Sequence, residues 1–357
     1  MTTGEPLPEA GHPRPGDELD IPRVEAYLRE HLEGFDGPLE VQQFSHGSAN
    51  LTYLLSSPSG EYILRRPPRG DLAPGAHDMA REHKVLSRLW THFPLAPRSY
   101  LFCDDPAVAG AIFFVGERRR GVVIHTGLPP ELADFPDVGR RVSFALVDAM
   151  AALHDVDYEA ASLGDLGRPE GFTERQLTGW RKRWDLAKFE DDPLFDQVGE
   201  ELATRMPSST GHSLVHNDLK LDNCQFQPGD PDRVTSIFDW DMTTLGDPLV
   251  DLGTLLGYWG DPGDEHDRTP SGDRDAIPGL PLREEIAARY SEQRQVPLGT
   301  IAWYEAFALW KTCVVVQQLH ARYVNGQSSN PRHATITDRI PGLLRMALPT
   351  ARRAPLT

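Results

Sequence analysis

Three polar residues stand at a spacing that suits phosphoryl transfer. His216, Asp218 and Asn223 form the pattern H-x-D-x-x-x-x-N, and a further acid, Asp239, follows the apolar run 234–238. Phosphoryl transfer needs an acid that orients the attacking hydroxyl and accepts its proton, and it needs oxygen ligands that hold Mg²⁺ against the nucleotide phosphates. We expect Asp218 to be that acid, and Asn223 with Asp239 to be the Mg²⁺ ligands. The order and spacing are typical of a kinase catalytic loop followed by a metal-binding strand.

Each of these residues taken alone has an ordinary structural interpretation. A single asparagine such as Asn223 is most often a turn residue, and an acid such as Asp239 can cap the end of a strand. Their joint order and spacing favour the catalytic interpretation. We assign His216 a structural role, in which it braces the loop rather than moves protons. Asp251, near the start of an expected helix, either braces this loop from below or is a plain acid at a helix N-terminus.

The elements that must position these residues begin with a helix and a β-meander. The spacing of apolar residues predicts a helix over residues 21–32 and strands over 39–44, over 51–56 and from 62 to 65. A small polar loop, residues 45–50, joins the first two strands. Small residues let backbone N–H groups approach phosphate oxygens. Gly47, Ser48 and Asn50 are therefore predicted to contact a nucleotide, and the alternative is an ordinary hairpin.

The third strand lacks the lysine that a kinase usually places there to hold phosphates. Arg65 occupies the strand position instead, and its permanent charge and bidentate fork can bind phosphate or carboxylate. Arg66 is the alternative, if Arg65 is a surface residue. Glu82, on the helix expected over residues 77–90, is the candidate partner of Arg65. The alternative for Glu82 is a solvated position on the helix face.

A strand expected over residues 111–115 leads into the sequence GERRRG. We predict that this segment is a hinge, at which the backbone of Glu117 and Arg118 binds the adenine. The arginines could also be read as a nucleic-acid patch, but in an acidic chain they are better interpreted as surface. Beyond the hinge the pattern is helical, with helices over residues 138–156, 282–293 and 300–323. Residues 260–282 are rich in Pro, Gly and charge, and a long mobile loop or lid is expected there.

These elements predict an α+β protein with a β-rich N-terminal part and a mainly helical C-terminal part. The expected division is a disordered tail over residues 1–20, a β-rich nucleotide-binding N-lobe over 21–116, a hinge over 117–121, and a mainly helical catalytic C-lobe over 122–357. A chain of 357 residues is long enough for two modest domains.

Composition narrows the function further. The net charge of −17 argues against non-specific binding of nucleic acid and of anionic membrane surfaces. Three cysteines, far apart and odd in number, make a disulfide framework or a zinc site improbable and indicate a reducing cytosol. The N-terminus does not read as a signal peptide, and no apolar stretch is long enough to span a bilayer. A cytoplasmic protein is expected.

The chain resembles the aminoglycoside phosphotransferase and choline kinase superfamily over residues 35–325. Within it, the chain is similar to the kinase-like domains fused to acyl-CoA dehydrogenases in animals. The motifs that carry the resemblance are SHGSANLTY, YILRRPPRG, AHDMAREHKVL, RQLTGW, VHNDLKLDN and IFDWDMTTLGDPLVDLG. YILRRPPRG points to the subgroup, because there an arginine takes the place of the usual lysine.

The resemblance implies a bilobal kinase-like fold, ATP in the cleft between the lobes, and transfer of the γ-phosphoryl group to a small-molecule hydroxyl. It implies Asp218 as base, Asn223 and Asp239 as Mg²⁺ ligands, and Arg65 with Glu82 as a phosphate clamp. Two residues depart from the pattern. Gly116 stands just before the hinge where a bulkier residue is expected, and Asp241 stands where the subgroup more often has glutamate.

The acceptor and the turnover itself are left open by the sequence. An aminoglycoside, a hydroxy acid or hydroxyacyl thioester, and a choline-like alcohol held in an aromatic cage are the three acceptor classes. A second class of function is a nucleotide-binding pseudokinase, which the missing strand lysine would favour. A metal-dependent hydrolase, with Asp218 orienting water, is a third. The choice between ATP and GTP and the oligomeric state are not determined.

Overall fold

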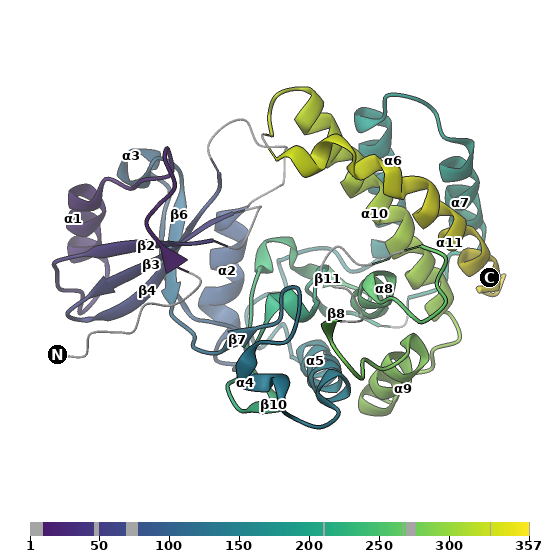
Figure 1. Cartoon of the computed structure of the whole chain (residues 1–357), viewed down its shortest axis with the longest axis horizontal. Coiled ribbons are helices and arrows are strands. Elements are labelled where there is room, and N and C mark those ends of the chain that lie inside the picture. The colour runs from purple at the N-terminus through teal and green to yellow at the C-terminus, as the bar shows by residue number, and fades with distance from the viewer. Residues whose placement is uncertain are drawn as a thin grey trace. The chain divides into compact units, whose positions relative to one another are not determined.

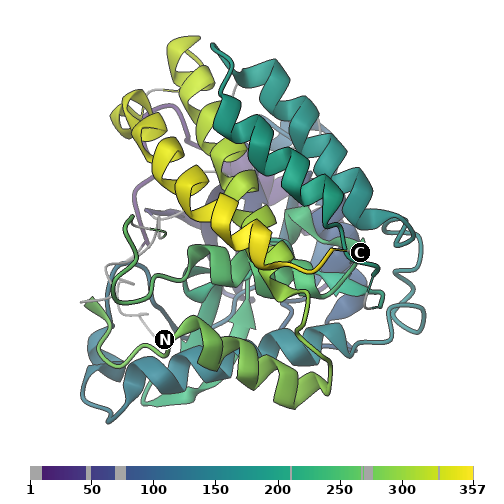
Figure 2. The same cartoon turned by 90° about the vertical axis from the view of Figure 1, so that its right-hand side faces the viewer.

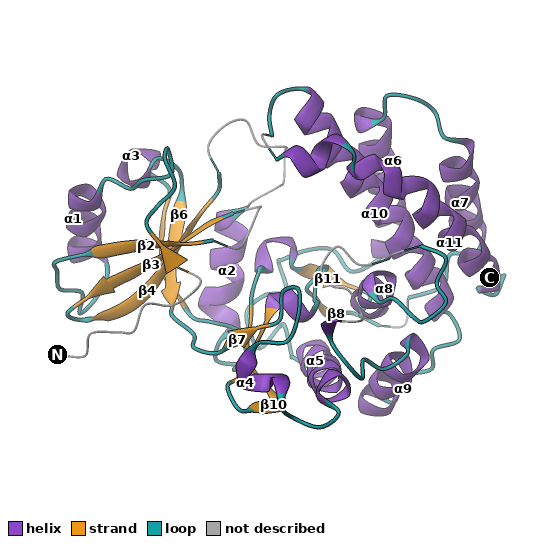
Figure 3. Cartoon of the chain, viewed as in Figure 1, coloured by secondary structure: helices purple, strands orange, loops and turns teal. Residues whose placement is uncertain are grey.

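The computed structural model describes residues 10–45, 50–68, 78–209, 211–266, 268, 276–328 and 330–356. Its N-terminal part is built on an antiparallel sheet and its C-terminal part is mainly helical, which confirms the α+β class (Figure 3). The chain forms two compact units. The first comprises residues 1–120 with 238–243, and the second comprises residues 121–237 with 244–357.

A six-stranded antiparallel sheet organises the first unit (Figure 1). Its strands follow the order β1-β2-β3-β4-β6-β5, and their bounds are Ala10–Gly11 (β1), Glu40–Phe44 (β2), Leu51–Ser57 (β3), Gly60–Arg66 (β4), Ser99–Cys103 (β5) and Phe113–Glu117 (β6). The three strands predicted between residues 39 and 65 are β2, β3 and β4. In β4 the side chains alternate between the two faces of the sheet, so that Arg65 and Arg66 point to opposite sides.

One face of this sheet is covered by α1 (Ile21–His31) and the short α3 (Pro106–Ala109). Asp20 caps α1 by accepting the backbone N–H of Arg23 at 3.2 Å. The fully buried side chains of Val24 and Leu28 pack with strand residues such as Leu64 in one apolar cluster. The predicted helix over residues 21–32 thus lies where the apolar spacing placed it.

Residues 10–20 are ordered, which differs from the disordered tail expected over residues 1–20. β1 pairs with β2, and the backbone carbonyl of Asp17 accepts hydrogen bonds from the Tyr53 hydroxyl at 2.7 Å and from Arg66 Nη2 at 3.1 Å. Arg66 is completely buried, so its guanidinium requires acceptors, and the N-terminal segment supplies one. Leu19 of the same segment joins the apolar cluster. Residues 1–9 lie outside the described part of the chain.

The other face of the sheet meets α2 (Met79–Leu89), whose N-terminus is capped by Asp78. The segment Phe238–Thr243 belongs to this unit, although the sequence assigned it to the C-lobe. Its short 3₁₀ helix η2 (Trp240–Met242) packs against α2, and the buried ring of Trp240 meets Phe93 edge to face at 6.1 Å. Packing, rather than position along the chain, therefore attaches this segment to the first unit.

Helices dominate the second unit. Their bounds are Pro130–Ala133 (α4), Val138–His154 (α5), Phe172–Ala187 (α6), Pro193–Thr204 (α7), Leu249–Tyr258 (α8), Arg283–Arg294 (α9), Ile301–Val324 (α10) and Ile340–Arg353 (α11). The three helices predicted here from the sequence correspond to α5, α9 and α10, with ends shifted by at most two residues. α10 is central, because it packs against α6, α8 and α11 (Figure 2).

Two small antiparallel sheets complete the second unit. One has the order β10-β9-β7, formed by Asp230–Ile237, Cys224–Gln227 and Val122–Val123, and the other pairs β8 (Ser213–Val215) with β11 (Thr244–Gly246). Helices α8 and α10 approach so closely that a Cβ added at Gly253 would lie 2.5 Å from the Cβ of Tyr304. None of the helices in the described ranges combines the length and apolarity that crossing a bilayer requires.

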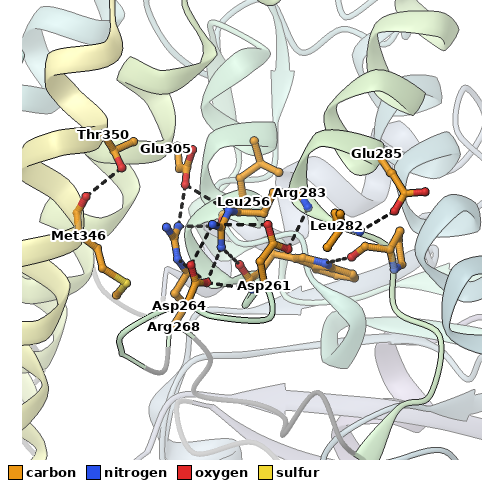
Figure 4. A network of polar contacts seen from close by, with 12 residues as sticks. Leu256, Asp261, Asp264, Arg268, Leu282, Arg283, Glu285, Glu305, Met346 and Thr350 are labelled. Carbon is orange, nitrogen blue, oxygen red and sulfur yellow. Dashed lines mark hydrogen bonds and ion pairs between the residues drawn. The ribbon is translucent and has the colours of Figure 1, made fainter.

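A buried ionic network ties the segment after α8 to α10 (Figure 4). Arg268 Nη1 donates to Glu305 Oε1 at 2.7 Å, and Arg283 Nε lies 3.5 Å from the same oxygen. Asp264 receives both arginines, and Asp261 pairs with Arg283 at 3.4 Å. The sequence predicts a mobile loop over residues 260–282. In the structure, these ion pairs connect the described parts of that loop to α10. Residues 267 and 269–275 lie outside the described part of the chain.

We expect Glu305→Gln to lower the free energy of unfolding by about 3 kcal/mol, because it leaves two largely buried guanidinium groups with one fewer carboxylate. Urea denaturation measures this loss. Glu284→Gln, at an exposed position of α9, is the matched control and should leave stability nearly unchanged. Equal stabilities of the two variants would show that the network does not hold the loop.

Candidate active site

The H-x-D-x-x-x-x-N segment forms a loop between β8 and the 3₁₀ helix η1 (Leu221–Asn223) of the second unit. Asp251, in the first turn of α8, braces this loop through backbone hydrogen bonds. Its Oδ2 accepts the N–H of His216 at 2.7 Å, and its Oδ1 accepts the N–H of Asn217 at 2.6 Å. Asn217 adopts the left-handed conformation, with φ of 67°, which a non-glycine residue takes up only when its surroundings enforce it.

The Asp251 carboxylate is completely buried and needs this set of donors. Its Oδ2 also lies 3.1 Å from His154 Nε2, and His154 Nδ1 lies 2.7 Å from the Tyr290 hydroxyl. Burial raises the pKa of Asp251, but the hydrogen bond and charge of His154 and the neighbouring His216 outweigh burial and bring the pKa below its usual value. Asp251 therefore acts on the loop as a charged acceptor, and the buried His154 supports it from below.

Asp218 follows the braced turn and keeps its carboxylate partly in solvent, with 22% of the side chain exposed. Its Oδ2 lies 3.2 Å from Lys220 Nζ and accepts a hydrogen bond from Asn223 Nδ2, also at 3.2 Å. Burial lowers the pKa of Lys220, but the charges of Asp218 and Asp222 prevail and raise it. A carboxylate fixed in this way can orient a hydroxyl group and accept its proton.

Asn223 is turned so that its amide nitrogen faces Asp218. Nδ2 donates to the Asp218 backbone carbonyl at 2.8 Å as well as to the carboxylate. With the nitrogen engaged on this side, the amide oxygen points away from Asp218 and is the atom that suits a hard cation such as Mg²⁺. The donor set at Asn223 therefore fits the metal that the sequence implies.

The predicted metal acid Asp239 and the predicted clamp residues come together in the first unit. Arg65 Nη2 pairs with Asp239 Oδ1, and Arg65 Nε lies 3.2 Å from Glu82 Oε2. Asp239 has a left-handed backbone with φ of 67°, and the N–H of the next residue, Trp240, donates to Glu82 Oε1 at 3.4 Å. Arg66 lies on the other face of the sheet, so Arg65 is the arginine that meets the acids.

One guanidinium here faces three carboxyl groups, because Asp241 also acts on Arg65 and Glu82. Burial raises the pKa of Glu82, Arg65 opposes this, and the charges of Asp239 and Asp241 raise it again, so that the pKa is about 8. The carboxyl groups of this cluster therefore repel one another. A divalent cation at Asp239 would offset that repulsion, which is a second respect in which the residues fit Mg²⁺.

Part of the predicted phosphate loop can be placed. Asn50 is buried, and its Nδ2 donates to Asp241 Oδ2 at 3.4 Å. This contact links the end of the loop to the acid that departs from the subgroup pattern. Gly47 and Ser48 lie outside the described residues.

The predicted hinge follows β6. The backbone N–H of Glu117 donates to the Arg98 carbonyl at 2.8 Å, so this N–H is already engaged, and its side chain pairs with Arg119 Nε at 3.0 Å. The guanidinium of Arg118 lies over the ring of Phe44, 5.5 Å from its centre. The same carbonyl explains why position 116 is a glycine and not the bulkier residue expected there. A Cβ at Gly116 would lie 3.1 Å from the Arg98 carbonyl oxygen.

Two residues beside Asp218 were not linked to it from the sequence. Lys220 stands two residues after Asp218 within the motif. This spacing could have indicated that its ammonium lies beside the Asp218 carboxylate. Tyr258, at the end of α8, hydrogen-bonds Asp218, and its pKa is raised by burial and then by that carboxylate. No local pattern connects Tyr258 with a residue forty positions earlier.

Comparisons with known proteins show the family to which the chain belongs. The model of the phosphotransferase enzyme family matches residues 40–289. The chain belongs to this family. Acyl-CoA dehydrogenase family member 11 of Rattus norvegicus is 31% identical over 354 residues, which cover 95% of this chain and 44% of that protein. The Homo sapiens protein is 31% identical over 330 residues, covering 88% and 41%. The chain thus spans less than half the length of these curated relatives.

Solved structures give the same result for the fold. A Ralstonia eutropha protein, assigned as an aminoglycoside phosphotransferase, is 30% identical with a TM-score of 0.77, and the match covers 95% of this chain and all of that one. A ternary complex of an aminoglycoside phosphotransferase APH(4)-Ia mutant with AMP-PNP and hygromycin B has a TM-score of 0.58 at 18% identity, covering 92% and 98%. The kinase-like fold and the family resemblance inferred from the sequence are confirmed.

We expect the stability cost of Arg65→Met to depend on pH. The pKa of Glu82 is higher in the folded chain than its ordinary 4.5, so Glu82 favours folding at low pH and this contribution is lost as the pH rises toward about 8. Removing Arg65 raises that pKa further. The loss in unfolding free energy should therefore be greater near pH 9 than near pH 7, by about 1.4 kcal/mol for each pH unit above about 8 at which Glu82 stays protonated in the variant.

Urea denaturation at the two pH values measures this difference. The double variant Arg65→Met with Glu82→Gln carries no titrating acid at residue 82 and should show a cost that is nearly independent of pH. A cost for Arg65→Met that is equal at both pH values would contradict the proposed coupling of the two side chains.

Proposed function

We propose that this chain transfers the γ-phosphoryl group of ATP to a hydroxyl group of a small molecule. The observation that carries the proposal is the loop in which Asp218, partly exposed, is held by the amide of Asn223 and follows a turn braced by Asp251. In the proposed reaction the acceptor oxygen forms a bond to the γ-phosphorus, the bond from that phosphorus to the β,γ-bridging oxygen breaks, and ADP leaves. The hydroxyl proton passes to Asp218.

We propose Asn223, through its amide oxygen, and Asp239, through its carboxylate, as the ligands of Mg²⁺. The ion would neutralise charge on the β- and γ-phosphates, and phosphate oxygens and water would complete its coordination. No group of three or more His, Cys, Asp and Glu side chains suited to a metal occurs among the described residues. The proposed set is of a different kind, because it combines one amide with one carboxylate.

The nucleotide contacts are part of the same proposal. Arg65, oriented by Glu82, is assigned to the phosphates, together with the loop residues Gly47, Ser48 and Asn50. The hinge residues Glu117 and Arg118 are assigned to the adenine, where backbone groups other than the engaged N–H donor of Glu117 must take part. The fold shared with a phosphotransferase that binds AMP-PNP supports a nucleotide in this role.

The residues around Asp218 favour a neutral or anionic acceptor over a polycation. The ammonium of Lys220 stands 3.2 Å from the proposed base, so an amine of an aminoglycoside would approach a like charge. An aromatic cage for a choline-like alcohol also loses support. The aromatic residues that could form such a cage are Trp180, Trp184, Tyr258, Trp259, Trp303 and Tyr304, and all of them except Tyr258 are buried in the core. A hydroxy acid or hydroxyacyl compound is the remaining class.

The alternative function is a nucleotide-binding module without turnover. The absence of a lysine in β4 first suggested it, but Arg65 pairs with Glu82 as that lysine would be expected to do. The base and both proposed metal ligands are retained. We also propose a cytosolic location, which three buried cysteine thiols support.

We expect Asp218→Asn to lower kcat for phosphoryl transfer by about 1,000-fold while the affinity for ATP stays nearly the same, because the amide cannot accept the proton. A coupled assay of ADP formation, run with hydroxy acids, amino alcohols and aminoglycosides, measures both quantities. Asp222→Asn, in the same loop, is the matched control and should keep most of the activity. Equal activity of Asp218→Asn and the wild-type enzyme would show that Asp218 is not the base.

A further inference from the structure

A lysine is buried beneath the candidate catalytic loop. Lys311 lies in the middle of α10 with 4% of its surface exposed, and its ammonium donates to the backbone carbonyl of Asn217 at 3.2 Å. Burying an ammonium group is costly, and a lysine in a helix core is normally replaced without loss by an apolar side chain of similar length. Its presence calls for a role that an apolar side chain cannot fill.

The carbonyl that Lys311 holds is the one that leads into Asp218. It belongs to the peptide bond between Asn217 and Asp218, so its direction sets the start of the Asp218 backbone. The N–H of Asn217 is held on the other side by Asp251 Oδ1 at 2.6 Å. Both polar backbone groups of this left-handed residue are therefore bound by charged side chains of opposite sign.

The two charged side chains come from helices that are locked together. Asp251 is in α8 and Lys311 is in α10, and these helices meet at the close contact of Gly253 with Tyr304. A left-handed conformation is strained for asparagine, so it persists only where its surroundings fix it. The rigid pair of helices supplies that constraint.

Burial dominates the surroundings of Lys311 and leaves its pKa below the ordinary value, although the carboxylates of Asp218 and Asp251 oppose this and Lys220 and Arg183 add to it. The amine can donate to the Asn217 carbonyl in either protonation state. The ammonium also lies 5.7 Å from the centre of the Trp180 ring, a distance at which a cation is attracted to the ring.

We propose that Lys311 is a positioning residue, which fixes the peptide before Asp218 from the side opposite Asp251 and so aims the Asp218 carboxylate at the acceptor hydroxyl. This inference rests on the proposed function, because it assigns Lys311 a part in the same transfer. It goes beyond the motif, since Lys311 lies 94 residues from Asn217 in the sequence.

The test is Lys311→Met, which keeps the length and the packing of the side chain but removes the donor. We expect kcat for ADP formation to fall by about 10- to 100-fold with the KM for ATP unchanged, because the base is misaimed while the nucleotide still binds. The melting temperature should stay the same or rise. Lys182→Met, on the exposed face of α6, is the matched control and should behave like the wild type.

Hydrogen exchange of the Asn217 amide gives a second readout that needs no activity. In Lys311→Met it should exchange about tenfold faster, because the turn opens more often, and in Lys182→Met it should not change. Lys311→Gln, which keeps a donor without the charge, should lose less activity than Lys311→Met. If both Lys311 variants fail to fold while the control folds, Lys311 is a stability residue and the inference is overturned.

The outcomes separate this inference from the function on which it rests. An unchanged kcat in Lys311→Met, with Asp218→Asn inactive, overturns the role of Lys311 and leaves the function standing. If the wild-type enzyme and Asp218→Asn are equally inactive, the proposed function fails. The exchange of the Asn217 amide then still decides whether Lys311 holds the loop, and an unchanged rate refutes it.

Discussion

The second unit depends on one buried carboxylate. Asp251 is completely buried, and its two oxygens collect the backbone N–H groups of His216 and Asn217 together with the ring of His154. A buried carboxylate without hydrogen-bond donors would destabilise the fold. The loop therefore adopts the conformation that supplies all of these donors. The left-handed turn at Asn217, and with it the placement of Asp218, follows from this requirement.

The first unit also depends on buried charge, but there several carboxyl groups surround a single arginine. Arg65 is shared by Glu82, Asp239 and Asp241, and Glu82 among them is buried. Three carboxyl groups are thus gathered around one arginine. A fold that maximised its own stability would avoid this arrangement, but a site that receives a metal cation with its nucleotide would require it.

The sequence predicted what depends on local patterns. Apolar spacing placed β2, β3, β4, α5, α9 and α10 within a few residues, and the motif spacing identified Asp218, Asn223 and Asp239 as candidates. It did not place the segment Phe238–Thr243 with the first unit, because that association is made by the packing of Trp240. It also did not connect Lys311 or Tyr258 with the catalytic loop, because their contacts join residues distant in the chain. The ordering of residues 10–20 was missed for the same reason, since a buried Arg66 provides it.

The central claim is that Mg²⁺ and ATP bind together, and a thermal-shift measurement tests it most directly. A ligand that binds only the folded state raises its stability in proportion to the logarithm of its concentration over its Kd. We predict that millimolar ATP raises the melting temperature clearly when Mg²⁺ is present and much less in its absence, and that Asp239→Asn removes this difference. No shift with both ligands present, or an equal shift without the metal, would contradict the account.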